Sequence, residues 1–202
     1  MQSGAALVFW ERSFPGDLHD ELARLVLDGL DDVAFTTDAG ALEADLSEAL
    51  NAAGYPQTVA LRSDIAMIAR RHAAVLDTSA IKIRLEVIDT DACRKFHADY
   101  VTVRTISTYL GQGTQWIAAG SADEAGVPGG PRIRQIAAGA IAMFKGRLWQ
   151  EPPSVLHRSP PIQATAEQRL VLVIDPVATA NDGIAGAGSV ADPGPTRPVV
   201  LA

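Results

Sequence analysis

From residue 80 onward the chain consists of short strand candidates separated by glycine and proline. The stretch 80–89, AIKIRLEVID, alternates apolar Ile81, Ile83 and Leu85 with charged residues, which is typical of a strand with one buried face. Further strand candidates are YVTVRTISTYL (100–110), TQWIAAG (114–120), PRIRQIAAG (131–139), AIAMFKG (140–146), SVLHRS (154–159) and QRLVLVID (168–175). Because helices do not alternate with these strands, the pattern favours a sandwich or barrel over a doubly wound parallel sheet.

The first 79 residues have a different periodicity. Apolar residues recur at helical spacing in three segments, GDLHDELARLVLDGL (16–30), DAGALEADLSEALNAAG (38–54) and SDIAMIARRHAAVLD (63–77). We therefore expect an α+β fold in which a mainly helical part (1–79) and a β part (80–175) form one domain (1–175). Residues 176–202 consist mainly of Ala, Gly, Pro and small polar residues, and we expect them to form a disordered tail.

Charge and cysteine content exclude several classes of function. The chain of 202 residues has a formal charge of −7 and no run of Lys or Arg, so we expect no nucleic-acid partner. No segment approaches the ~20 apolar residues of a membrane span, and the N-terminus is unlike a signal peptide. These features predict a cytoplasmic protein without a membrane partner. Cys93 is the only cysteine, which excludes an internal disulfide and a thiolate zinc cluster within one chain.

The stretch CRKFHADYVTV (93–103) contains the residues with the clearest chemical potential. His97 and Asp99 are two positions apart, and in a strand such residues project from one face with Cα atoms about 6.5–7 Å apart. His157 lies in a later strand candidate, and Arg169 begins another. Two histidines and one carboxylate are the ligands of non-haem iron(II) oxygenases and leave three metal positions open. An arginine nearby could hold the carboxylate of a cosubstrate through two hydrogen bonds.

Structural interpretations of the same residues remain open. His97 and Asp99 are equally compatible with the polar end of an ordinary strand, and Arg169 with neutralisation of a buried carboxylate. Tyr109 has the strand parity of Asp99, so we expect it to face inward unless a bulge intervenes; a core tyrosine with a satisfied hydroxyl is the alternative. Arg104 has the opposite parity and is expected to pack outward or against the helices.

The remaining candidate residues have simpler expectations. His19 and His72 lie in predicted helices, where we expect surface or packing roles. Asp175 is expected to cap its strand, and Cys93 to be a small buried residue or an unreactive thiol.

Five stretches together resemble a known family over nearly the whole chain except the tail. They are FWERSFP (9–15), RLEVIDTDACRKFHADYVTVRTISTYLGQGTQWI (84–117), GAIAMFKG (139–146), HRSP (157–160) and RLVLVID (169–175). The sequence resembles the domain-of-unknown-function 1826 family of bacterial proteins, for which the resemblance implies no established activity.

A more distant resemblance is to the iron(II)/2-oxoglutarate-dependent dioxygenases. Their order of His-x-Asp, a long gap, His and then a basic residue is matched by His97, Asp99, His157 and Arg169. The resemblance implies a double-stranded β-helix, a jelly-roll or cupin-like barrel, with the N-terminal helices packed on it. It also implies that His97, Asp99 and His157 are catalytic residues that bind Fe(II), and that Arg169 and Tyr109 bind 2-oxoglutarate. The sequence RSPP directly after His157 departs from the general pattern of these enzymes.

Three classes of function remain open at this stage. The first is an oxygenase that acts on an unknown small-molecule or peptide substrate. The second is a zinc-binding or metal-homeostasis protein, including a zinc hydrolase. The third is a barrel scaffold without catalysis. The sequence does not define the oligomeric state.

Overall fold

Two antiparallel sheets form the β part of the protein. The computed structural model describes residues 4–55, 58–120, 130, 132–177 and 199–201. The strands are β1 (Leu7–Trp10), β2 (Val33–Asp38), β3 (Ala80–Ile88), β4 (Val103–Leu110), β5 (Gln115–Ala118), β6 (Arg134–Gln135), β7 (Ile141–Lys145), β8 (Val155–Arg158), β9 (Arg169–Pro176) and β10 (Val199–Leu201). The large sheet has the order β10-β1-β7-β4-β9-β3-β2, and the small sheet has the order β6-β5-β8.

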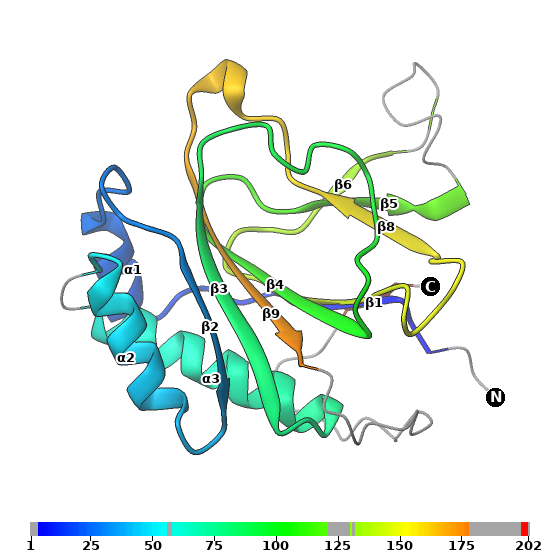
Figure 1. Ribbon diagram of the computed structural model, residues 1–202. Helices are drawn as coiled ribbons and strands as arrows, with labels where there is room; N and C mark the ends of the chain where they lie inside the picture. The colour runs from blue at the N-terminus through cyan, green and yellow to red at the C-terminus, as the bar shows by residue number, and fades with distance from the viewer. Residues whose placement is uncertain (1–3, 56–57, 121–129, 131, 178–198, 202) are drawn as a thin grey trace.

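Three α-helices lie beside the large sheet. They are α1 (Gly16–Arg24), α2 (Leu42–Ala52) and α3 (Val59–Leu76), and a short 3-10 helix spans Gln163–Thr165. Their apolar residues recur on one face, so each helix buries a row of leucine or isoleucine side chains. Figure 1 shows the helices on one side of the large sheet and the small sheet on the other side.

The hydrophobic core is divided between the two faces of the large sheet. The first cluster joins the helices to the sheet through residues such as Leu46, Ile65, Leu85 and Leu172. The second cluster lies between the two sheets and includes Phe9, Ile106, Trp116, Phe144 and Val171. Alternate residues of β9 enter opposite clusters, because successive side chains of a strand point to opposite faces.

The α+β class predicted from the sequence is confirmed, and its β part is built from two sheets. The closed barrel that we expected is not confirmed, since the described strands of the two sheets share no ladder. From β3 to β9 the chain passes repeatedly from one sheet to the other, with β3, β4, β7 and β9 in the large sheet and β5, β6 and β8 in the small sheet.

The N-terminal part is less helical than its periodicity predicts. The segments LVFW and VAFTTD form β1 and β2, and both belong to the large sheet. These segments contain four and six residues, which is too short for a sequence pattern to distinguish strand from loop. In the structure, β1 at the start of the chain becomes part of the large sheet by pairing with β7.

Two parts of the tail that we expected to be disordered (176–202) belong to strands of the large sheet. Pro176 ends β9, and Val199–Leu201 form β10, which pairs with β1. Residues 178–198 and 202 lie outside the described residues. Among the helices that the structure describes, none has the length and apolar character needed to cross a membrane.

His72 predicts a measurable dependence of stability on pH. His72 is a buried residue of α3, and its Nδ1 lies 2.7 Å from the hydroxyl of Thr105 on β4. Burial lowers the pKa of His72 to about 4, and Asp175 opposes this shift only weakly. The unfolded chain, with an ordinary histidine pKa, binds more protons between pH 6.5 and 4, so stability falls as the pH falls through this range.

We expect His72 to contribute a loss of about 2 kcal/mol in the free energy of unfolding between pH 7 and pH 5. Urea denaturation at both pH values tests this. The variant His72→Gln should show a pH dependence that is smaller by this amount, because the titrating group has been removed. An identical pH dependence in both proteins would show that His72 is not the responsible group.

Candidate metal centre

The two histidines are brought together by backbone pairing rather than by sequence proximity. His97 and His157 form an isolated antiparallel bridge, in which each backbone N–H donates to the other residue's carbonyl at 3.0 and 2.9 Å. The bridge places the segment around His97 beside β8, on the side of the small sheet. The ring centroids of the two histidines are consequently 4.8 Å apart.

Asp99 completes a group of three potential metal ligands. One ligand atom from each of His97, Asp99 and His157 lies within 4.8 Å of the other two. Among the described residues, these three form the cluster of His, Cys, Asp or Glu side chains that could hold a metal ion. Nε2 of His157 is 3.1 Å from Oδ2 of Asp99, and Nε2 of His97 is 3.8 Å from Oδ1. Oδ2 is buried and has no hydrogen-bond partner among the described residues. A metal ion would satisfy this oxygen.

The backbone also sets the tautomer of His97. Nδ1 of His97 lies 2.8 Å from the carbonyl oxygen of Lys95, and a carbonyl oxygen can only accept a hydrogen bond. Nδ1 therefore carries a proton, which makes Nε2 the nitrogen of His97 that is available to bind a metal. Such a hydrogen bond to the second ring nitrogen is how proteins orient metal-binding histidines.

The electrostatic environment favours the protonation states that bind metal. Burial would raise the pKa of the Asp99 carboxyl, but contact with His157 and the charges of Arg104 and His97 bring that pKa below its ordinary value. Burial lowers the pKa of His157, although the nearby Asp99 carboxylate opposes this shift. An ionised carboxylate beside a neutral imidazole is the pair that a divalent metal requires.

A tight turn holds the backbone of Asp99. The amide of Arg147 donates to the Asp99 carbonyl at 2.8 Å, and the amide of Gly146 donates to the Thr102 carbonyl at 2.8 Å. A Cβ atom on Gly146 would lie 2.1 Å from the Val101 carbonyl oxygen and 2.7 Å from that of Asp99. Only glycine fits this close approach, which explains the glycine after the β7 strand.

Arg169 is a buried cation without a carboxylate partner among the described residues. Its side chain is 1% exposed, Nε donates to the Gln112 carbonyl at 2.6 Å, and one terminal nitrogen donates to the Ser159 hydroxyl at 3.0 Å. The other terminal nitrogen, NH2, is buried and has no hydrogen-bond partner. Burial lowers the pKa of Arg169 to about 10. The nearby Glu167 carboxylate opposes this shift, so part of the arginine charge is compensated within the chain. Nη2 nevertheless lacks a hydrogen-bond partner among the described residues, and it could donate to an anionic ligand.

Ser159 links Arg169 to the metal group, and the sequence analysis assigned it no role. It follows His157 by two residues, so its hydrogen bond brings the guanidinium close to the metal-binding end of β8. The signal in the sequence was the unusual RSPP that follows the histidine.

The structure places Tyr109 away from the metal group. Its ring belongs to the cluster between the large sheet and the helices, and its hydroxyl donates to Oδ2 of Asp64 at 2.7 Å. Residues 100–102 interrupt the strand, and the pairing of β4 with β9 shifts register between Thr108 and Leu110. The uninterrupted strand on which the inward orientation of Tyr109 depended is therefore absent, and Tyr109 is instead a core tyrosine with a satisfied hydroxyl. In this position it does not support the expected contact with 2-oxoglutarate.

The same interruption reverses the expectation for Arg104. Its guanidinium contacts the Asp99 carboxylate, with 2.6 Å between NH1 and Oδ1. Asp175 also differs from its expected capping role, because it forms two hydrogen bonds with Arg104, at 2.7 and 2.8 Å. Cys93, which we expected to be buried or unreactive, is exposed.

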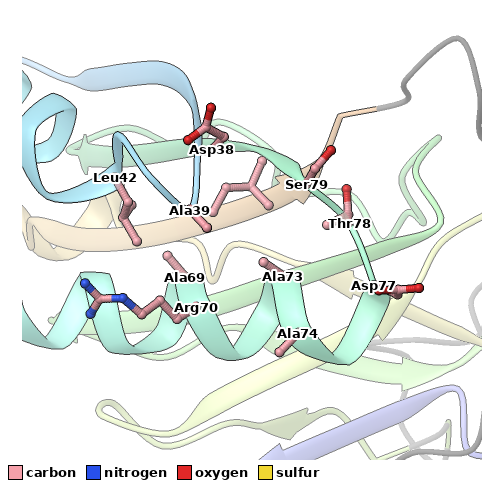
Figure 2. A pocket seen from close by; sticks show the side chains of 11 residues that line it. Asp38, Ala39, Leu42, Ala69, Arg70, Ala73, Ala74, Asp77, Thr78 and Ser79 are labelled. Atoms are coloured by element: carbon pink, nitrogen blue, oxygen red, sulfur yellow. The ribbon is translucent and has the colours of Figure 1, made fainter.

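A pocket of about 280 Å³ lies on the opposite, helical side of the large sheet. Figure 2 shows alanines 69 and 73 of α3 facing Leu42 and Ala39 across it, with polar residues such as Asp77 and Thr78 at its edge. No histidine or cysteine lines this pocket.

Comparison with known families identifies the chain. The family model described as "Protein of unknown function (DUF1826)" matches residues 1–175. The chain belongs to this family. The match covers all the described residues except the two at 176–177 and β10, and it confirms the resemblance seen in the sequence. A search of curated proteins finds no match to the chain.

Several solved structures are similar to the chain at low sequence identity. A prolyl-4-hydroxylase from Pseudomonas putida is 16% identical, with 85% of this chain and 91% of that chain covered and a TM-score of 0.46. The Fe(II)/(alpha)ketoglutarate-dependent dioxygenase TqaL is 14% identical, with coverage of 91% and 82% and a TM-score of 0.43. A 2OG-Fe(II) oxygenase family protein from Caulobacter crescentus is 14% identical, with coverage of 87% and 64% and a TM-score of 0.38.

Proposed function

We propose that this protein is an iron(II)- and 2-oxoglutarate-dependent oxygenase of a small-molecule or peptide substrate. The observation that carries the proposal is a pair of buried polar groups without hydrogen-bond partners, one beside His157 of β8 and the other bonded through its side chain to Ser159, which follows β8. Asp99 presents a buried oxygen without a hydrogen-bond partner beside two histidines, and Arg169 presents a buried N–H group without an acceptor. The first group suits a divalent metal, and the second suits the carboxylate of a dicarboxylic cosubstrate.

The strand order supports the double-stranded β-helix that such an enzyme requires. If the His97 segment is counted as a strand of the small sheet, the eight segments from β3 to β9 are distributed in the order large, small, large, small, small, large, small, large. This is the alternation of a jelly roll, in which two sheets are wound from one folded hairpin. Its large sheet is extended by β1, β2 and β10.

Each residue of the site has a defined role in this proposal. His97, Asp99 and His157 would hold Fe(II) through Nε2, Oδ2 and Nε2. When bound, the metal supplies the activation of dioxygen for oxidation of the substrate, coupled to decarboxylation of 2-oxoglutarate. Arg169, held by Gln112 and Ser159, would bind the distal carboxylate of the cosubstrate with its free N–H group.

The chain also orients His157 and shields it from water. The Phe144 ring packs on His157, with 4.5 Å between the ring centroids, and fixes the plane of the imidazole. Phe144 belongs to the apolar cluster between the two sheets. This cluster provides the low-dielectric wall in which the charges of Asp99 and Arg169 act strongly.

Anaerobic binding of Fe(II) followed by 2-oxoglutarate tests the proposal. We expect one metal site per chain, and tight 2-oxoglutarate binding only when the metal is present, because the cosubstrate contacts both the metal and Arg169. Admission of oxygen should then convert 2-oxoglutarate to succinate and CO2, slowly without the substrate. Tight Zn(II) binding with no affinity for 2-oxoglutarate would instead support a metal-handling protein or hydrolase, and absence of any metal binding would support the scaffold.

A further inference from the structure

Arg104 is the charged residue nearest to Asp99 that the proposed function leaves without a role. NH1 of Arg104 lies 2.6 Å from Oδ1 of Asp99. The remaining edge of the guanidinium forms a fork with Asp175, with Nε donating to Oδ1 at 2.7 Å and NH2 donating to Oδ2 at 2.8 Å. One arginine from β4 therefore connects a carboxylate of β9 to the candidate metal ligand.

The fork with Asp175 fixes the direction in which Arg104 points. The guanidinium is planar, so two hydrogen bonds on one edge determine the position of the third nitrogen. Arg84 of β3 contacts the same Asp175 carboxylate at 3.4 Å, and it pairs with Glu86 at 2.6 Å. The Arg104 side chain is 17% exposed and that of Asp175 is 11% exposed, so water screens the contacts little.

The two oxygens of Asp99 consequently have different surroundings. Oδ1 is held by Arg104 at 2.6 Å and lies 3.8 Å from Nε2 of His97. Oδ2 is buried, lies 3.1 Å from Nε2 of His157 and has no hydrogen-bond partner among the described residues. A carboxylate that is free to rotate could offer both oxygens to one metal ion. A fixed cation on one oxygen restricts the rotation of the carboxylate and competes with the metal for that oxygen, so it favours binding through the other oxygen.

We infer that Arg104 is a positioning residue that makes Asp99 a ligand through Oδ2 alone. This inference rests on the proposed metal site. A single oxygen ligand leaves one more metal position free for the cosubstrate than a two-oxygen ligand would. Asp175 acts through Arg104, because it holds the guanidinium in the orientation that reaches Asp99.

Binding of Co(II) to the full chain tests this inference without any assay of activity. The visible absorption of Co(II) depends on the number and arrangement of its ligands, so it reports on the coordination of Asp99. In Arg104→Gln the carboxylate is released, and we expect Co(II) affinity to fall about 10- to 100-fold with a changed visible spectrum. In Arg104→Lys the charge remains without the planar fork. The Co(II) affinity should therefore lie between those of wild type and Arg104→Gln, while the spectrum resembles that of Arg104→Gln.

Two further variants keep the result interpretable. Arg158→Gln alters an arginine that is next to His157 but bonds to Gln115, and its Co(II) affinity should remain within about twofold of wild type. Asp175→Asn removes the charge that anchors Arg104 and retains the Arg104 side chain. We expect it to change the spectrum in the same direction as Arg104→Gln, and it replaces that variant if Arg104→Gln does not fold.

The possible outcomes separate this inference from the proposed function. The role of Arg104 would be overturned, and the metal site left intact, if wild-type protein binds Co(II) and the folded variant has the same affinity and spectrum. The folded variant is Arg104→Gln or its replacement, Asp175→Asn. Wild-type protein that binds no divalent metal would overturn both. A weaker affinity with an unchanged spectrum in Arg104→Gln would assign Arg104 a charge effect only and would also overturn the positioning role.

Discussion

The variant His97→Ala is expected to lose its bound Fe(II) and, with it, all turnover of 2-oxoglutarate. Removal of one of three protein ligands should weaken metal binding by more than about 100-fold, since loss of even a supporting hydrogen bond costs 10- to 100-fold. The His97 side chain is 36% exposed, so its removal should cost little stability. Metal content measured by elemental analysis after anaerobic purification and reconstitution checks the prediction.

His157→Ala and His19→Ala complete this experiment. His157→Ala should lose metal equally, with some loss of stability, because the ring is buried against Phe144. His19→Ala is the control, because the His19 side chain lies on α1, is 72% exposed and has its Nδ1 3.6 Å from the exposed Asp20 carboxylate. Full metal content in the folded His97→Ala and His157→Ala variants would show that any metal is bound elsewhere.

Arg169→Met is expected to abolish 2-oxoglutarate binding without destabilising the protein. The desolvation cost of the Arg169 charge is only partly offset by its two hydrogen bonds and by the nearby Glu167 carboxylate. An apolar side chain of similar length should therefore leave the free energy of unfolding unchanged or raise it by about 1–2 kcal/mol. The affinity for 2-oxoglutarate in the presence of metal should fall by at least about 100-fold, because the distal carboxylate loses its charge-assisted hydrogen bond.

Arg12→Met provides the matched comparison for this prediction. Arg12 is also largely buried, but it forms two hydrogen bonds with Asp64, one of them at 2.8 Å, and its removal should cost about 3 kcal/mol or more. Urea denaturation of both variants without ligand measures this contrast, and calorimetric titration with 2-oxoglutarate measures binding. If Arg169→Met is destabilised as strongly as Arg12→Met and still binds 2-oxoglutarate, the prediction is wrong. Arg169 would then have a structural role only.

Local patterns were sufficient to predict the elements of the β part. The alternation in AIKIRLEVID predicted β3, and the β-branched segments ending in glycine or proline predicted β4 to β9, because period-two burial is a property of consecutive residues. The three helices were predicted for the same reason, from leucines that recur every three or four positions. The short strands β1, β2 and β10 were missed, since they become strands only by pairing with neighbours that are distant in the sequence.

The sequence by itself determined the α+β class, the family and the ordered set His97, Asp99, His157 and Arg169. Only the tertiary structure decided which groups surround this set. Strand parity holds only along an uninterrupted strand, and the break at residues 100–102 with the shift after Thr108 turned Arg104 toward Asp99 and Tyr109 toward the helices. Similarly, the sequence could not show that one terminal nitrogen of Arg169 lacks a hydrogen-bond partner, because the groups around it include residues that are distant in the sequence, such as Gln112.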